Sequence, residues 1–344
     1  MPKNWEKVAL HYRQLLDQST GRLSYLVYDD LLGWTVGPNR RSVDGRYWSS
    51  SEGIRAPHEG VTFAKLGGKT RIALVGDSMT FGEEVTYEDT WGYFLEKALG
   101  PEFQVLNFGV GGYGVDQAYL RYEKDVRMWN PKIVIFGFIS HDVIRSMIVY
   151  PFLTFRHWDF PFSKPRFILR DGEIARLNVP PLAPDALFSR GSISELPFLE
   201  HDRGYKQSDW EKSLYHLSYL ARLFVTSFPR WSAENPDVSD EAMVSVNASI
   251  LKAFVRSAEQ AGATPLVVYF PEGNAEFARP SFPLSIGKRV LQQAGVAYID
   301  PTSCLLELNP DDRFARGGHY SPKGNAAIAN CLHNVVHQAL AEAS

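Results

Sequence analysis

Cysteine is scarce in this chain of 344 residues, and long apolar runs are missing from it. Cys304 and Cys331 could form one disulfide, but we expect them to be reduced thiols. No stretch approaches the roughly 20 apolar residues that a membrane-spanning helix needs. The start of the chain also has no apolar core of signal-peptide length. These absences predict a cytoplasmic protein without a transmembrane segment, although a partner could still bring it to a membrane.

An excess of basic charge is missing as well. The formal net charge is -3 at pH 7. A nucleic-acid-binding protein usually presents a basic face, so we expect no nucleic-acid partner. Hydrophobic residues make up 44% of the chain, which is enough to form a core and argues against disorder.

Five short apolar runs, separated by helical patterns, indicate the strands of one sheet. The runs are 71–75, 105–108, 133–136, 265–270 and 296–299. Strands that alternate with helices predict a parallel sheet with helices on both faces. We therefore expect a three-layer α/β/α sandwich of flavodoxin-like topology, in which the runs, numbered along the chain, lie in the order 2-1-3-4-5.

The predicted core is interrupted between its third and fourth strands by roughly 120 residues, far more than an ordinary crossover contains. We expect a core of residues 67–145 and 241–344, an inserted cap of residues 146–240, and an N-terminal helix with an irregular leader in residues 1–66. Aromatic residues are dense at the start of the insertion, where they could line a pocket or form the core of the cap. They are Tyr150, Phe152, Phe155, Trp158, Phe160, Phe162 and Phe167.

Residue types suited to acyl transfer follow the predicted strands. Ser78 follows the first strand, Gly112 the second and His141 the third, and His319 lies after the fifth. Because the carboxyl ends of parallel strands meet at one edge of a sheet, we expect these residues to lie together. A nucleophile, a base and hydrogen-bond donors for an oxyanion are what acyl transfer requires.

Several segments resemble the SGNH (GDSL-type) hydrolase family, in particular its bacterial carbohydrate esterase-like members. Gly-Asp-Ser-Met-Thr-Phe-Gly at 76–82 is similar to the family's first block, and Asn-Phe-Gly-Val-Gly-Gly-Tyr at 107–113 to its second. Gly-His-Tyr-Ser-Pro-Lys-Gly-Asn at 318–325 is similar to its last block. Residues 28–34 and 52–55 more weakly resemble a leader found in some bacterial members.

The resemblance covers most of the predicted core and implies a role for each matching residue. Ser78 would attack the ester, His319 would be the general base, and the amides of Ser78 and Gly112 would bind the oxyanion. The implied substrate is a small acyl ester, such as an acetyl ester, of a carbohydrate or similar alcohol. The implied alternatives on the same fold are an O-acyltransferase, a lipase or a thioesterase.

Two positions depart from the family's pattern. The family's third block carries an asparagine whose amide completes the oxyanion hole, and this chain has His141 there. An imidazole N–H can also donate, so we expect His141 to do so, with a simple bond to Asp142 or water as the alternative. The family's aspartate, three residues before the histidine, is replaced by Arg316. We expect Asp312 to orient His319 instead; another carboxylate, a backbone carbonyl or a Ser–His dyad are the alternatives.

The loss of the usual acid also leaves open a binding module without catalysis. Neither a cofactor nor a metal is expected. The glycines of 109–114 match a dinucleotide-binding pattern, but the acid that should follow roughly 20 residues later is missing. His333 and His337 are four residues apart but lack an evident third ligand.

Overall fold

A five-stranded parallel sheet forms the centre of the computed structural model. Its strands are β5 (Thr70–Val75), β6 (Phe103–Asn107), β7 (Ile133–Phe138), β10 (Thr264–Tyr269) and β11 (Tyr298–Ile299). Across the sheet they lie in the order β11-β10-β7-β5-β6. Read from the β6 edge, this is the predicted order 2-1-3-4-5. The structure describes residues 3–18, 21–65, 67–155, 158–210, 220, 223, 236–274, 277 and 284–342.

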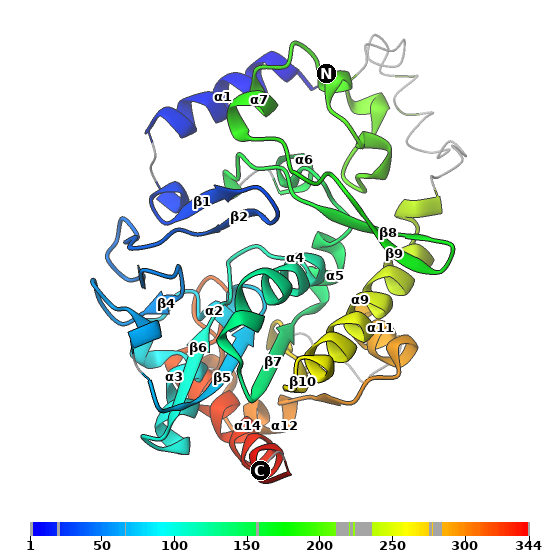
Figure 1. The fold of residues 1–344 in the computed structure, drawn as a ribbon. Helices are drawn as coiled ribbons and strands as arrows, with labels where there is room; N and C mark the ends of the chain where they lie inside the picture. The colour runs from blue at the N-terminus through cyan, green and yellow to red at the C-terminus, as the bar shows by residue number, and fades with distance from the viewer. Residues whose placement is uncertain are drawn as a thin grey trace.

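Helices cover both faces of the sheet, which confirms the three-layer sandwich (Figure 1). On β5, Ile72 and Leu74 belong to an apolar cluster with residues of α3 and α14, whereas Ala73 and Val75 belong to a second cluster with residues of α4 and α9. This alternation is what a strand buried on both faces requires. The helices of the core are α3 (Trp91–Leu99), α4 (Val115–Arg121), α5 (Ser140–Arg145), α9 (Asp240–Gln260), α11 (Ile286–Ala294), α12 (Thr302–Leu306), α13 (Pro310–Arg313) and α14 (Pro322–Glu342).

The leader contains the predicted helix, α1 (Trp5–Gln18), but its remainder is not irregular throughout. It forms two antiparallel pairs, β1 with β2 and β3 with β4. Asp29 fixes the turn between β1 and β2, because its Oδ1 accepts the backbone N–H groups of Leu31 and Leu32. The bounds are β1 (Leu26–Asp29), β2 (Gly33–Val36), β3 (Trp48–Ser49) and β4 (Arg55–Ala56).

The helix α1 packs against the insertion, far away in the sequence. Tyr12 stacks on Phe188 with 4.9 Å between ring centroids, and Trp5 and Phe152 join the same apolar cluster. In Figure 1, α1 lies beside α7 at the end of the molecule opposite α12 and α14. The described elements of the insertion are α6 (Pro151–Thr154), β8 (Arg166–Arg170), β9 (Glu173–Leu177) and α7 (Pro184–Phe188).

Cys304 and Cys331 form a disulfide between α12 and α14, so the expectation of reduced thiols is wrong. The two helices pack together and bring the Cα atoms to 6.0 Å, within the usual range for a disulfide. Among the described residues, no helix has both the length and the apolar character needed to cross a membrane.

Candidate active site

Ser78 lies in a tight connection between β5 and the short helix α2 (Ser78–Phe81). Gly76 has a φ of +156°, and a Cβ there would lie 2.4 Å from the carbonyl oxygen of Gly137, so only glycine fits. Asp77 caps the helix, because its Oδ1 accepts the backbone N–H of Met79 at 2.9 Å. The end of β5, the glycine at position 76 and the Asp77 cap together fix Ser78 at the edge of the sheet.

A continuous chain of hydrogen bonds joins Ser78 to His319 and His319 to Glu84. Nε2 of His319 lies 2.9 Å from Oγ of Ser78. Nδ1 of His319 lies 2.9 Å from Oε2 of Glu84. With the proton on Nδ1, Nε2 keeps a lone pair for the serine hydroxyl, and this is the arrangement that activates a serine.

The Glu84 carboxylate is held in place by the backbone of the histidine loop. It accepts the backbone N–H groups of Gly317 at 2.7 Å and His319 at 3.0 Å. Partial burial raises the pKa of Glu84, but these N–H groups and the His319 side chain outweigh it and hold the pKa below its ordinary value. Glu84 is therefore ionised at neutral pH and can accept the imidazole N–H.

Asp312 does not reach His319, so the expectation that it orients the base is wrong. It lies on α13, where its Oδ1 accepts a hydrogen bond from Lys323 at 3.0 Å. The chain then turns tightly, with the N–H of Ala315 donating to the carbonyl of His319 at 2.7 Å. This turn directs the imidazole toward the segment after α2, where Glu84 lies. The carboxylate thus comes from elsewhere in the chain, one of the alternatives left open above.

Glu84 was not among the predicted site residues, because it lies 235 positions before the histidine that it contacts. It lies six positions after Ser78 and adopts a left-handed backbone with a φ of +72°. Its N–H donates to the hydroxyl of Tyr47 at 2.9 Å. The only available signal was an acidic residue shortly after the Gly-Asp-Ser segment.

Four of the five predicted site residues surround one pocket of about 380 Å³: Ser78, Gly112, His141 and His319. Gly112 has a φ of +81°, and a Cβ there would lie 3.1 Å from the ring of Phe160. Its lack of a side chain therefore suits both the backbone conformation and the narrow space beside the ring.

His141 is paired with an acid that the sequence did not suggest. Its Nδ1 lies 2.7 Å from Oε2 of Glu272, and its side chain is 55% exposed. The hydrogen bond to Glu272 raises the pKa of His141. When Nδ1–H is donated to Glu272, only the imidazolium still carries a proton on Nε2 for a second acceptor. The Asp142 carboxylate instead accepts the backbone N–H of Ile139 and a hydrogen bond from Arg145.

Buried charges lie beneath the serine. Nη1 of Arg145 lies 2.6 Å from Oδ1 of Asp142 and 3.3 Å from Oδ2 of Asp77. Burial raises the pKa of both carboxyl groups, and the proximity of Asp77 adds to the increase at Asp142. The guanidinium ties the helix cap at Asp77 to α5, so the serine and His141 are fixed to one buried network.

Some aromatic residues of the insertion line the pocket, and others form part of an apolar core. Phe155, Trp158 and Phe160 line the pocket with Ser78. Phe155 and Trp158 are stacked with 4.1 Å between ring centroids. Tyr150 and Phe152 instead belong to the apolar cluster under α1.

Comparisons with known proteins give a distant likeness. No family model matches the chain, and no curated protein matches it in sequence. Similar solved structures include a lipase/acylhydrolase from Enterococcus faecalis, with 13% identity, a TM-score of 0.39, and 78% of this chain and 96% of that chain covered.

Two further similar structures have comparable values. A catalytic mutant of Axe2, an acetylxylan esterase from Geobacillus stearothermophilus, has 14% identity and a TM-score of 0.38, covering 78% of this chain and 95% of that one. A member of the lipolytic protein G-D-S-L family from Veillonella parvula has 12% identity and a TM-score of 0.38, covering 78% and 99%. Similarity this low adds nothing to the geometry of the site itself.

Proposed function

We propose that this protein is a serine esterase with Ser78 as nucleophile, His319 as general base and Glu84 as the residue that orients the base. The observation that carries the proposal is the hydrogen-bond chain from Ser78 through His319 to Glu84, with 2.9 Å at each step. A buried structural histidine needs neither a serine hydroxyl on one nitrogen nor an ionised carboxylate on the other.

The reaction would be a double displacement. Oγ of Ser78 attacks the ester carbonyl while Nε2 of His319 takes its proton. The amides of Ser78 and Gly112, with the protonated His141, bind the oxyanion. His319 then gives the proton to the leaving alcohol, and water, activated by His319, releases the acyl group from Ser78.

For the substrate we propose a small acyl group, such as acetyl, on a carbohydrate or similar alcohol. Three aromatic side chains and several polar ones line the pocket, and such a mixture suits a sugar, which offers both an apolar ring face and hydroxyl groups. The Cys304–Cys331 disulfide supports an oxidising compartment rather than the cytoplasm expected from the sequence. To test this, the protein would be expressed in the cytoplasm and in an oxidising compartment and alkylated without reduction. Mass spectrometry then shows in which of the two Cys304 and Cys331 escape alkylation.

The alternatives differ in the molecule that accepts the acyl group or in the length of the acyl chain. An O-acyltransferase would pass it from Ser78 to a second alcohol, so products formed with and without an added sugar acceptor separate it from a hydrolase. A lipase or thioesterase would favour long acyl chains. The binding-module alternative was motivated by the missing acid, and Glu84 supplies a carboxylate at the required place.

The decisive experiment is hydrolysis of p-nitrophenyl acetate by the wild type and by Ser78→Ala, with folding matched by circular dichroism. We expect turnover to fall to background in the variant. A fluorophosphonate should label the wild type at Ser78 and leave the variant unlabelled. Turnover that survives in Ser78→Ala would refute the proposal.

A further inference from the structure

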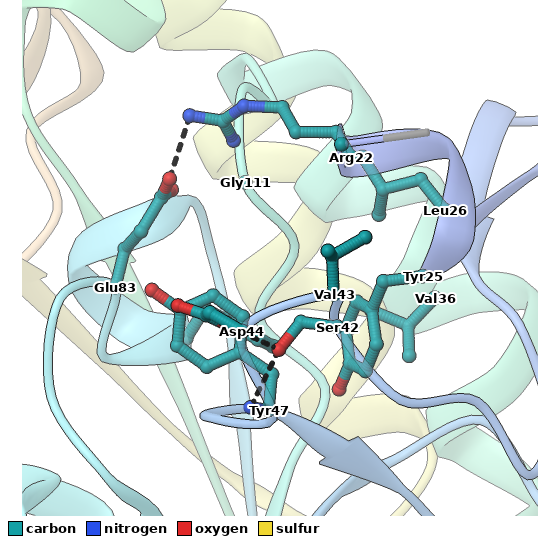
Figure 2. Close-up of a pocket in the computed structure, with 12 residues that line it drawn as sticks. Arg22, Tyr25, Leu26, Val36, Ser42, Val43, Asp44, Tyr47, Glu83 and Gly111 are labelled. Carbon is teal, nitrogen blue, oxygen red and sulfur yellow. Dashed lines mark hydrogen bonds and ion pairs between the residues drawn. The ribbon is translucent and has the colours of Figure 1, made fainter. Parts of the chain in front are cut away.

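A second pocket, of about 370 Å³, lies beside the active-site pocket, and its size is in the range of small-molecule sites. Most of its wall residues come from the leader, and Glu83 and Gly111 complete the edge (Figure 2), with Phe81 of α2 among the remaining lining residues. The apolar residues of these walls are Tyr25, Leu26, Val36, Val43, Tyr47 and Phe81.

The polar groups of this pocket are already engaged. Oγ of Ser42 donates to Asp44 at 2.6 Å and accepts the backbone N–H of Tyr47 at 2.9 Å. The hydroxyl of Tyr25 donates to the carbonyl of Trp48 at 2.9 Å. The apolar lining residues present ring and methyl surface to a ligand, and an apolar group fits such a pocket because it requires no new polar partner.

The two pockets meet at an ion pair. Arg22 and Glu83 line both, and they pair at 2.6 Å across one edge of the second pocket (Figure 2). The pair packs closely on the backbone of Gly111, since a Cβ there would lie 3.1 Å from each of these side chains. The Arg22 side chain is 43% exposed and that of Glu83 is 14% exposed, so solvent screens the pair in part and Arg22 is the partner that can turn outward.

This boundary lies on the side where the alcohol leaves. Oε2 of Glu83 is 3.9 Å from Nε2 of His319, the atom that returns the proton to the leaving oxygen in the proposed mechanism. A group on that oxygen that reached the second pocket would pass the Arg22–Glu83 pair, which lines both pockets.

We propose that the second pocket is a subsite for an apolar group on the alcohol part of the ester. This inference rests on the proposed function, and it adds a specificity that a polar sugar alone would not use. The natural alcohol would then be amphipathic, with the esterified oxygen beside His319 and an apolar substituent among Val43, Val36 and Phe81.

The test varies the alcohol while the acyl group stays acetyl. Ethyl, butyl and hexyl acetates have similar intrinsic reactivity, so their kcat/KM values report binding of the alkyl chain. We expect kcat/KM to rise along this series by up to about fourfold for each added methylene group. Val43→Glu should lower the value for hexyl acetate by about tenfold and leave ethyl acetate unchanged, because it replaces apolar wall at the solvent-exposed mouth of the pocket with a hydrated carboxylate.

The matched control is Met128→Glu. Met128 is 76% exposed and Val43 is 71% exposed, but Met128 lines neither pocket. The control should follow the wild type along the series. A flat alcohol series in the wild type would overturn the proposal. So would a dependence on Val43 that appears when the acyl chain is lengthened, from ethyl acetate to ethyl hexanoate, and not when the alcohol is.

A binding measurement separates failure of the subsite from failure of the esterase proposal. Fluorescence titration of Ser78→Ala with 2-naphthol needs no turnover. We expect the double variant Ser78→Ala, Val43→Glu to bind 2-naphthol about tenfold more weakly, and the double variant with Met128→Glu to bind it like Ser78→Ala. If no ester is hydrolysed and this difference persists, the pocket stands and the catalytic proposal fails. Equal binding by all three would overturn the subsite.

Discussion

Replacement of Glu84 by glutamine is the sharpest test of how the base is oriented. Glutamine keeps the shape but loses the charge, and its amide can donate to Nδ1 of His319. The imidazole would then carry its proton on Nε2, which could no longer accept the proton of Ser78. The analogous loss of the acid in serine proteases lowers kcat by about 10⁴-fold.

The partial exposure of Glu84 lowers the expected effect. Its side chain is 22% exposed, and solvent partly screens its interaction with His319, so we expect kcat for p-nitrophenyl acetate to fall by about 10³-fold, or about 4 kcal/mol in the activation free energy. KM should change little, because Glu84 does not line the active-site pocket. Asp312→Asn is the control and should keep the wild-type kcat within about twofold, since it loses only an exposed contact with Lys323.

The assay is steady-state hydrolysis from pH 5 to pH 9, with circular dichroism to match folding. The pH profile distinguishes orientation from simple loss of structure, because a wrong tautomer lowers kcat across the whole range in a folded protein. If Glu84→Gln keeps more than about a tenth of the wild-type kcat while Asp312→Asn loses activity, the assignment of the orienting acid is refuted.

Three further outcomes are expected. As an imidazolium donor, His141 acts only below its raised pKa, so kcat should fall as pH rises through that pKa. Glu272→Gln should move this fall, the alkaline limb of the pH profile, to lower pH. His141→Asn should remove it. An alkaline limb that stays in place in both variants would exclude this role for His141. The disulfide closes a separation of 27 residues, so Cys304→Ser should lower the free energy of unfolding by about 3 kcal/mol in urea, and equal stability with and without reductant would contradict it. Gly76→Ala would place a Cβ 2.4 Å from a backbone carbonyl, so we expect a loss of about 2–4 kcal/mol in stability and of most activity, whereas a stable, active variant would refute the close approach.

The ionisation of Glu84 also makes the stability of the folded protein depend on pH in the acidic range. The folded pKa of Glu84 lies below its ordinary value, so its contribution to stability is present above the unfolded pKa and is lost as pH falls through the folded pKa. Thermal melts of the wild type and Glu84→Gln should therefore converge on acidification below the ordinary range of a glutamate. A gap that stays constant into that acidic range would show that the charge of Glu84 does not stabilise the histidine loop.

The sequence by itself determined the sheet and the two residues that share the hydrogen bond at its edge, Ser78 and His319. The five apolar runs predicted the strands of one parallel sheet, because burial on both faces leaves a local signature in each parallel strand, and the flavodoxin-like topology expected for them has the order 2-1-3-4-5 that is found. Ser78 and His319 could be predicted because each lies in a short segment with a recognisable local pattern. Ser78 stands between the end of a strand and the start of a helix, and His319 follows a glycine shortly before the last helix.

Only the tertiary structure decided which groups meet those residues. Glu84 reaches His319 across 235 positions of sequence, through a left-handed turn after α2 and a tight turn before the histidine. His141 meets Glu272, and Cys304 meets Cys331, by the packing of separate elements. A local pattern records which face of a strand or helix is buried, whereas the partner of a side chain depends on how loops and helices from distant parts of the chain are packed together.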